Sequence, residues 1–500
     1  MGPRRDKKHC RIIILPPHPH SHGSDITMFH NCTTTMDTEE EVGSLQRSGP
    51  YAFKWTKLHL PRWKTDPLRY EYDTLSEKAL EKLQALAKQK GFSDDPRKRP
   101  DLYQLLSDNH ASHDNLQKFW EQLHTVPDWV DWDQLERGQR FFYRYAAANL
   151  MGFALQGFVG ENSAASGVVE VLVRTGGFST RVLLHRLLET FQWLLQVTES
   201  LQAIQPGGAG HTSTVRIRLL HSSVRQRILK MVESRPEYFD VETHGVPVNT
   251  LDSIHSIATF CCNHMWLQLP RMGVRPTDQE KEDYIALFRY LGYLLATPDE
   301  YFATVDQAKA TMESMLVHEL TVSKTSRVVC FNFIKCLVDL PPFNVSQGFI
   351  EAGSRVLNGD ELCDQLEMGR PGWVAYACFR GHCWLVSALA MAQQLSPTLD
   401  HWIIEHWKRL LHSAVIQSGL KGASKFDFKY IPQEGTRVEK EGNGRKGVKY
   451  GLVSRPVETF YLSIFVLGLI LASSACFGAA VSLRVTALYL ARWVSMYVEG

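Results

Sequence analysis

The chain has 500 residues, with 55 Lys and Arg against 53 Asp and Glu and a formal net charge of +2. This balance gives no reason to expect a nucleic-acid partner. The ten cysteines form no Cys-x-x-Cys pair, which argues against a zinc knuckle and a thioredoxin-type motif, so we expect buried free thiols.

The N-terminal segment, residues 1–50, is rich in Pro, His and Ser and ends near an acidic run. This composition predicts a disordered segment. Its apolar run, Ile12–Leu15, is too short for the core of a signal peptide. Residues 51–75 are aromatic and polar and indicate an irregular lead-in to the folded part.

Residues 51–420 are expected to form one helical domain. Apolar residues recur with helical spacing from about residue 76, and Ser76 and Gly91 are suited to begin and end the first long helix. The Gly-rich loop 206–210 separates two long apolar helices, and the alternation typical of strands is scarce. The sequence therefore predicts a mainly α fold, globin-like or bundle-like, without internal repeats.

The C-terminal part differs from the rest of the chain. Residues 421–456 are rich in Gly and Lys and predict a flexible basic linker. The next stretch, 460–483, holds 24 residues without a charge, and a helix of that length spans about 36 Å, enough to cross a bilayer. We expect a single transmembrane helix at 457–484 and a short tail at 485–500, a buried core helix being the alternative. Basic residues upstream of the helix predict that the large domain is cytosolic.

One predicted helix carries an unusual polar row beside its apolar stripe. Arg218, His221 and Arg225 are spaced i, i+3 and i+7, next to apolar positions that include Leu220 and Val224. Taken alone, this row is typical of a solvated helix face. A core-facing row would instead have to satisfy three polar groups.

The preceding helix carries a second polar patch, Arg186, Glu189 and Thr190, among Leu and Phe residues. Two adjacent apolar helices that each present arginine could enclose a flat, apolar group with an anionic edge. Haem has this character, because its propionates suit arginine and its iron takes a neutral histidine nitrogen.

The block from about 152 to 225 resembles the catalytic domain shared by bacterial rubber oxygenases (latex-clearing proteins) and the fungal ER-bound oxygenase of mycophenolic acid biosynthesis. The resemblance rests on VRTGGFSTRVLLHRLLET, PGGAG and RIRLLHSSVR, and downstream on GVPVNTLDSI (245–254) and DYIALFRYLGYLLA (283–296). It covers roughly residues 100–420, and five short motifs in the right order are fairly specific.

The resemblance implies a helical haem domain with a b-type haem whose iron is ligated by His221. Arg218 and Arg225 would hold the cofactor, and Arg186 with Thr190 would lie on the side that binds oxygen. The rubber oxygenases carry a lysine that can cap the iron where this chain has Glu189, so a lysine-capped resting state is not expected here.

An acidic residue acts as a base in the rubber enzymes, and by spacing Glu170 corresponds to it, although an ordinary surface carboxylate is an equal alternative. The implied reaction is oxidative cleavage of a carbon–carbon double bond by O2 in an isoprenoid or prenylated lipophilic metabolite. Such a substrate partitions into lipid, which gives the bilayer anchor at 460–483 a purpose. We expect a single-pass protein of an internal membrane, the endoplasmic reticulum, active in secondary metabolism.

Other classes of enzyme fit the sequence less well. A di-iron oxygenase would use two Glu-x-x-His pairs, and the chain offers Glu121 with His124 and only an aspartate version, Asp252 with His255. The zinc-peptidase, serine-hydrolase and P-loop motifs are incomplete or missing. A non-catalytic haem-binding membrane protein remains the main alternative.

Overall fold

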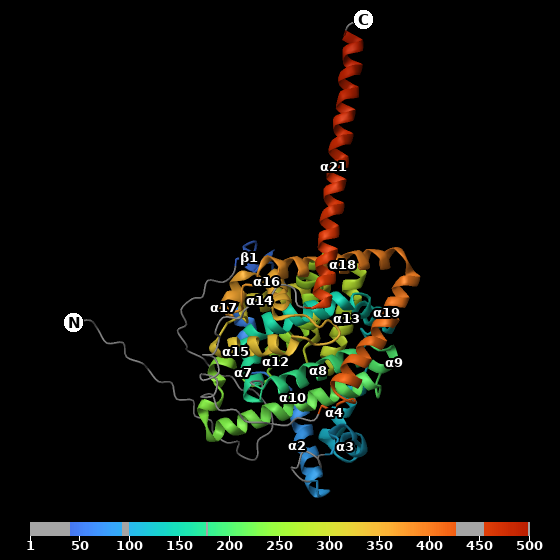
Figure 1. The fold of residues 1–500 in the computed structure, drawn as a ribbon. Helices are drawn as coiled ribbons and strands as arrows, with labels where there is room; N and C mark the ends of the chain where they lie inside the picture. The colour runs from blue at the N-terminus through green and yellow to red at the C-terminus, as the bar shows by residue number, and fades with distance from the viewer. Residues whose placement is uncertain (1–40, 93–99, 177–178, 427–454, 499–500) are drawn as a thin grey trace, which may run out of the picture. The chain divides into compact units, whose positions relative to one another are not determined.

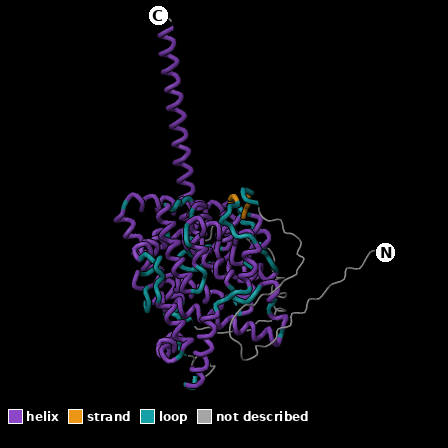
Figure 2. Tube along the Cα trace, turned by 180° about the vertical axis from the view of Figure 1, so that it is seen from behind, coloured by secondary structure: helices purple, strands orange, loops and turns teal. Residues whose placement is uncertain are grey.

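The computed structural model describes residues 41–92, 100–176, 179–426 and 455–498 (Figure 1). Most of the described chain is helical, as Figure 2 shows, which confirms the mainly α prediction. Most of the segment predicted to be disordered (1–40) and most of the predicted linker (427–454) lie outside the described residues.

The first described elements form a small hairpin, β1 (Leu45–Ser48) and β2 (Tyr51–Lys54), paired antiparallel with Ser48 opposite Tyr51. Disorder up to residue 50 was therefore a wrong prediction for β1. The two-residue turn includes Gly49 at φ +52°, a conformation that glycine adopts without strain. Buried Phe53 then fixes the hairpin on the helical body.

The helices follow in chain order, several of them preceded or followed by short 3-10 or π-helical turns. The first half comprises α1 (Arg62–Thr65), α2 (Thr74–Gln89), α3 (Leu102–Asn109), α4 (Asp114–His124), α5 (Trp132–Arg144), α6 (Ala146–Gly152), α7 (Ser166–Arg174), α8 (Thr180–Val197), α9 (Leu201–Ile204), α10 (Ala209–Ser234) and α11 (Val241–His244). The second comprises α12 (Thr250–Asn263), α13 (Asp278–Leu294), α14 (Val305–His318), α15 (Lys324–Leu337), α16 (Gln347–Asn358), α17 (Asp360–Gln365), α18 (Trp373–Leu395), α19 (Pro397–Leu411) and α21 (Pro456–Val498).

The centre of the core is α12, which packs against α13 and α14. Its apolar residues Ile254, Ile257 and Ala258 are fully buried, and so are the neighbouring Cys261 and Cys262. Every described cysteine is free and all but one are buried, as the sequence predicted. A π-helical segment, Phe153–Asn162, continues α6 and packs against α15 and α16.

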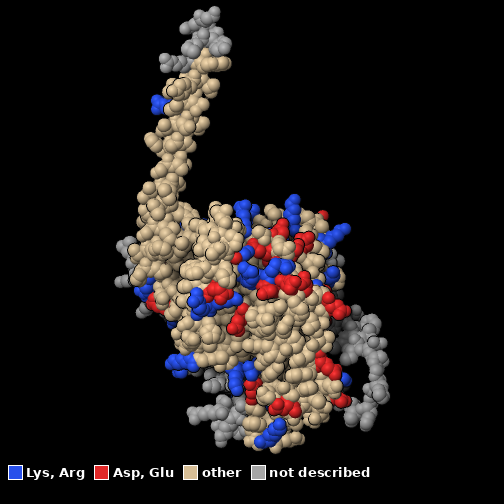
Figure 3. All heavy atoms as spheres, turned by 90° about the vertical axis from the view of Figure 1, so that its right-hand side faces the viewer, with Lys and Arg blue, Asp and Glu red and all other residues tan. Residues whose placement is uncertain are grey.

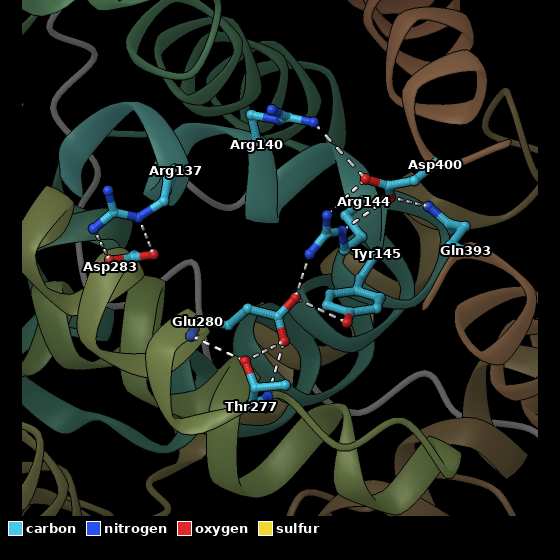
Figure 4. A network of polar contacts seen from close by, with 9 residues as sticks. All are labelled: Arg137, Arg140, Arg144, Tyr145, Thr277, Glu280, Asp283, Gln393 and Asp400. Atoms are coloured by element: carbon cyan, nitrogen blue, oxygen red, sulfur yellow. Dashed lines mark hydrogen bonds and ion pairs between the residues drawn. The ribbon is translucent and has the colours of Figure 1, made fainter. Parts of the chain in front are cut away.

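A polar network ties α5 to three other helices (Figure 4). Arg144, at the end of α5, donates two hydrogen bonds to Asp400 of α19 at 2.9 and 2.6 Å and one to Glu280 of α13 at 2.8 Å. Glu280 also completes a capping box with Thr277 at the start of α13, and Gln393 of α18 donates to Asp400 at 3.0 Å. This guanidinium therefore fixes the mutual positions of α5, α13 and α19.

The C-terminal helix α21 begins at Pro456, one residue before the predicted span, but it continues to Val498. The helix therefore extends into the predicted tail (485–500) as far as residue 498, because no Pro or Gly interrupts it before that point. Among the described residues, two helices are long and apolar enough to cross a membrane by length and composition, Trp373–Leu395 and Pro456–Ala491.

Replacing Arg144 with Met should destabilise the domain. The change leaves the buried carboxylate of Asp400 without its bidentate partner. Breaking one side of a fully buried pair costs about 3–5 kcal/mol, and the cost is lower here because the Arg144 side chain is 31% exposed. We expect a melting temperature several degrees lower, measured by intrinsic fluorescence in detergent. The control is Arg327→Met, which removes a half-exposed pair with Glu367 and should change the melting temperature much less. Equal shifts in the two variants would contradict this role of Arg144.

Candidate functional site

Helix α10 carries the polar row Arg218, His221 and Arg225. The helix starts where Gly208 and Gly210 pass close to the backbone of α9 and α8, because a Cβ at either glycine would overlap carbonyl oxygens there. Arg218 and Arg225 are only 3% and 2% exposed, less than the neighbouring Leu220. The row is therefore not a solvated face, and the structure excludes that interpretation for both arginines.

Arg218 joins α10 to three other helices. Its Nε and Nη2 donate to the carboxylate of Asp73 at 2.6 and 3.1 Å, and Asp73 is also the N-cap of α2. Its Nη1 donates to Gln122 of α4 and to the carbonyl of Leu294 at the end of α13, at 2.5 and 3.0 Å. The guanidinium lies 4.9 Å from the ring centroid of Phe119.

Arg225 holds the chain that leads into α12. Its Nε donates to the carbonyl of Pro247 at 3.2 Å and its Nη2 to that of Val248 at 2.9 Å. The guanidinium lies 3.7 Å from the Glu77 carboxylate and 4.7 Å from the ring centroid of Tyr72. Both arginines thus have protein partners, so the prediction that they hold a cofactor stays a prediction.

His221 lies at a shallow pocket between the segments that the two arginines hold, and the roughly 300 Å³ of this pocket includes space open to solvent. The lining combines α10, the start of α12, the end of α13 and one residue of the N-terminal part: Asp73, Arg218, His221, Ser222, Arg225, Val248, Asn249, Thr250, Ser253, Leu295 and Ala296. Sequences 245–254 and 283–296, which carry part of the family resemblance, therefore meet at His221.

Two residues in the wall of the pocket have left-handed backbone conformations. Val248 has φ +56° and Ala296 φ +61°, which costs a residue with a side chain about 1–3 kcal/mol. Arg225 bonds the carbonyl of Val248 itself, and Arg218 bonds that of Leu294, two residues before Ala296. The arginines that flank His221 in sequence thus brace the two strained turns that form its pocket.

His221 is a neutral imidazole. Burial, together with the charge of Arg225, lowers the pKa of His221 to about 4, against a smaller opposing effect of Asp73. Among the described residues, no side chain or backbone group forms a hydrogen bond with either ring nitrogen. A neutral histidine with a free nitrogen is the form that ligates metal ions.

The second predicted group, on α7 and α8, lies elsewhere. Arg186 donates to the side chain and the carbonyl of Thr175, and burial lowers its pKa to about 10. Thr190 donates to the carbonyl of Arg186 at 3.0 Å. Glu189 accepts a hydrogen bond from Ser424. Arg186 thus binds the residue that follows α7, Glu189 binds the segment that follows residue 419, and Thr190 bonds within α8.

Glu170 forms an ion pair with Arg174 one turn later, at 3.0 Å. None of Arg186, Glu189, Thr190 and Glu170 lines the pocket beside His221, although α8 and α10 pack side by side. The structure therefore places Arg218, His221 and Arg225 at one pocket. The residues predicted to serve the oxygen-binding side do not line that pocket. Both role assignments remain predictions.

Sequence reasoning missed a buried carboxylate in the core. Glu161, in the π-helical segment, accepts hydrogen bonds from His255 and Thr259 at 2.8 and 2.9 Å and from Gln156 at 2.7 Å. Burial alone would raise the pKa of Glu161, but the bond and charge of His255 lower it, and Glu161 in turn raises the pKa of His255 against the effect of burial. Both shifts favour the charged forms of the two side chains, and nothing in the sequence around Glu161 sets it apart from a surface Glu.

The di-iron alternative finds no support in the part of the chain that the structure describes. No group of three or more His, Cys, Asp or Glu side chains there could hold a metal ion. His124 donates its Nδ1–H to the backbone carbonyl of Trp120 at 2.8 Å and stacks on the ring of that residue, whereas His255 pairs with Glu161. The two predicted pairs thus have different partners and share no site.

Asp252, one turn before His255, provides a pH-dependent test of this core. Burial, and then the charge of Glu319, raise the pKa of Asp252 to about 7. Because this pKa is raised above that of the unfolded chain, the folded state binds the proton more tightly, and Asp252 costs stability as the pH rises from about 4 to 7. Asp252→Asn should remove this cost, at most about 4 kcal/mol.

The measurement is the melting temperature of both proteins between pH 4.5 and 8. The advantage of Asp252→Asn should grow with pH and level off above pH 7, whereas Glu136→Gln, on the exposed side of α5, should give no such trend. An advantage that is the same at every pH would exclude a raised pKa at Asp252.

The part of the chain that contains α10, α12 and α13 is similar to known proteins. The model of the family "ER-bound oxygenase mpaB/B'/Rubber oxygenase, catalytic domain" matches residues 116–388. The rubber oxygenase of Streptomyces sp. (strain K30) is 24% identical over 268 residues, which cover 51% of this chain and 61% of that protein. The chain thus spans less than two thirds of the length of this relative.

The fold is also similar to that of a solved structure, the latex clearing protein LCP in the closed state. The TM-score is 0.52 at 19% sequence identity, and the match covers 69% of this chain and 91% of that one. At this identity the likeness concerns the fold alone. Because the family model matches more than half of the 500 residues, the chain belongs to the family of ER-bound oxygenase mpaB/B' and rubber oxygenase catalytic domains.

Proposed function

We propose that this protein is a haem-dependent oxygenase that cleaves a carbon–carbon double bond of an isoprenoid or prenylated lipophilic metabolite with O2. The observation that carries the proposal is the pocket beside His221, whose walls come from three of the segments that resemble the family. The family of oxygenase domains to which the chain belongs supports the reaction class.

The residues at the pocket fit a haem in part. His221 fits the iron ligand, because it is neutral and makes no hydrogen bond to the described residues. The roughly 300 Å³ of the pocket includes space open to solvent, and the enclosed part holds only about one water molecule, so the macrocycle does not fit between the walls as they stand. The lining of the pocket is largely polar, which suits the propionate edge of a b-type haem better than the apolar faces.

In this proposal His221 supplies the ligand, and Arg218 and Arg225 act as positioning residues. Each arginine fixes a strained turn of the pocket wall, and burial together with the charge of Arg225 lowers the pKa of the imidazole. A bound haem would supply O2 binding and activation at its iron. Arg186 and Thr190 are proposed to serve the oxygen side, while Glu189 and Glu170 are its candidate acid–base groups.

We propose that α21 anchors the protein as a single-pass helix in an internal membrane, the endoplasmic reticulum, with the domain on the cytosolic side. An 18-residue stretch within Pro456–Ala491 has a mean hydropathy of 2.3, and none of that stretch is buried. A helix with this exposed apolar surface is stable in lipid and costly in water. A prenylated substrate would be concentrated in the same bilayer.

The first test compares purified wild-type protein with His221→Ala, both expressed with haem available. An optical spectrum and a pyridine haemochrome assay should show about one b-type haem per wild-type chain and a loss of at least tenfold in the variant, because a ligand bond is removed. The matched control is His211→Ala on the same helix, whose Nε2 pairs with the carbonyl of Leu123 at 2.8 Å. It should retain the haem.

A colourless wild-type protein, or an unchanged spectrum in His221→Ala, would exclude His221 as the ligand. Oxygen uptake with a prenylated substrate then separates the two haem functions. Uptake that depends on His221 supports the oxygenase. A haem protein that consumes no oxygen with any prenylated substrate supports the non-catalytic alternative.

A further inference from the structure

Helix α18 presents an apolar stripe to the outside. Trp373, Met391 and Leu395 are 75%, 61% and 85% exposed, and Trp384 lies on the same stripe. These positions recur with helical spacing, and Arg380 is the only Asp, Glu, Lys or Arg of the helix. An exposed stripe that is more apolar than its surroundings marks an interaction surface.

The opposite side of α18 belongs to the core. Phe379, His382 and Val386 are buried there, and the ring of His382 lies among those of Phe349, Phe379 and Tyr461. A helix with one side packed in the protein cannot be surrounded by lipid. Although its length would allow α18 to cross a membrane, its packing leaves only the stripe for contact with lipid.

The N-terminal end of α21 is fixed on the helical body next to α18. Arg455 pairs with Asp339 through two hydrogen bonds, and the carboxylate of Glu458 accepts from the backbone N–H of Ser346. Gly381 lets the two helices approach closely, because a Cβ there would overlap the carbonyl of Tyr461. In Figure 1, α18 lies across the N-terminal end of α21.

The stripe faces the direction in which α21 leaves the body. His382, on the core side of α18, contacts Tyr461, whereas Trp384, on the stripe, stacks on Phe465 and reaches Gly468 further along α21. From residue 469 to 491 every residue of α21 is exposed. Figure 3 shows uncharged surface that continues from α21 onto the adjoining part of the body.

The thickness of the bilayer places its near surface at the level of Trp384. Arg484 is the first charged residue of α21 after Glu458, and its guanidinium has to reach the far interface. A hydrocarbon core of about 30 Å corresponds to about 20 helical residues, and counting back from Arg484 leads to Phe465. The near interface thus coincides with Trp384, and tryptophan is enriched at such interfaces.

We infer that the α18 stripe, Trp373, Arg380, Trp384, Met391 and Leu395, lies in the interface of the bilayer that α21 spans. This inference rests on the proposed membrane insertion of α21. The apolar side chains enter the boundary between headgroups and acyl chains, and Arg380 binds lipid phosphate. The domain is thereby held flat against the membrane with α18 in the plane, rather than tethered at a distance.

The experiment uses the full chain in phosphatidylcholine vesicles that contain a phosphatidylcholine with a photoreactive diazirine in its acyl chain. After illumination, the lipid adducts are mapped by mass spectrometry of peptides. We expect adducts on α21 between about residues 465 and 484, and a second group on α18 between Trp384 and Leu395.

The test variant is Met391→Glu combined with Leu395→Glu. It should reduce the α18 adducts at least fivefold and leave the α21 adducts unchanged, because two carboxylates do not enter the interface. Leu45→Glu is the matched control, since Leu45 is 60% exposed on β1 and should label like the wild type. Unchanged melting temperatures establish that both variants fold.

The outcomes separate this inference from the proposed anchor. Adducts on α21 without adducts on α18 would overturn the inference and leave the anchor intact. No adducts on either helix would overturn both. A chain that is dimeric in single nanodiscs, unlabelled on α18 and rendered monomeric by the double variant would show that a second copy covers the stripe, which also overturns the inference.

Discussion

The contact between Arg218 and Asp73 determines how the rest of the site is arranged. An arginine buried to this extent is stable only when its donors are paired, and its partners come from α2, α4 and α13. Asp73 is at the same time the cap of α2, where it accepts a hydrogen bond from Ser76. One ion pair therefore sets the start of α2, the face of α10 and the end of α13.

Buried charge recurs throughout the domain as a means of joining helices. Arg225 binds the turn before α12, and Arg144 joins α5 to α13 and α19. Glu161 accepts hydrogen bonds from side chains of α12 and so joins α12 to the π-helical segment. Each of these groups bonds to an element that is distant in the sequence, and Arg218 and Arg225 donate to backbone carbonyls. The pocket beside His221 is thus formed by main chain that side-chain charges keep in strained conformations.

At the face formed by α18 and α21, the usual arrangement of apolar side chains inside and polar side chains outside is reversed. Charged groups lie inside the domain, while α18 and α21 expose large apolar side chains where they meet. In water this arrangement is unfavourable, but at a bilayer both the apolar stripe and the neighbouring Arg380 have partners. The proposed contact of α18 with lipid and the proposed lipophilic substrate are consistent with each other.

The sequence alone determined the helical class, the apolar C-terminal helix, the free buried cysteines and the family. These depend on local periodicity, composition and short motifs, which are properties of consecutive residues. The sequence also singled out His221 and its arginines, because their spacing places them on one face of α10. The start of α21 was predicted to within one residue, because the change from a polar to an apolar stretch is abrupt.

Only the tertiary structure decided what the arginines do. Their partners, Asp73 and the carbonyls of Val248 and Leu294, are distant in sequence, and Asp73 lies outside the matched family segment. The left-handed conformations of Val248 and Ala296 could not be read from residue types that normally avoid them. The pairing of Glu161 with His255 and the exposure of the α18 stripe were likewise hidden, since a periodic pattern shows that a helix has two faces but not which of them is buried.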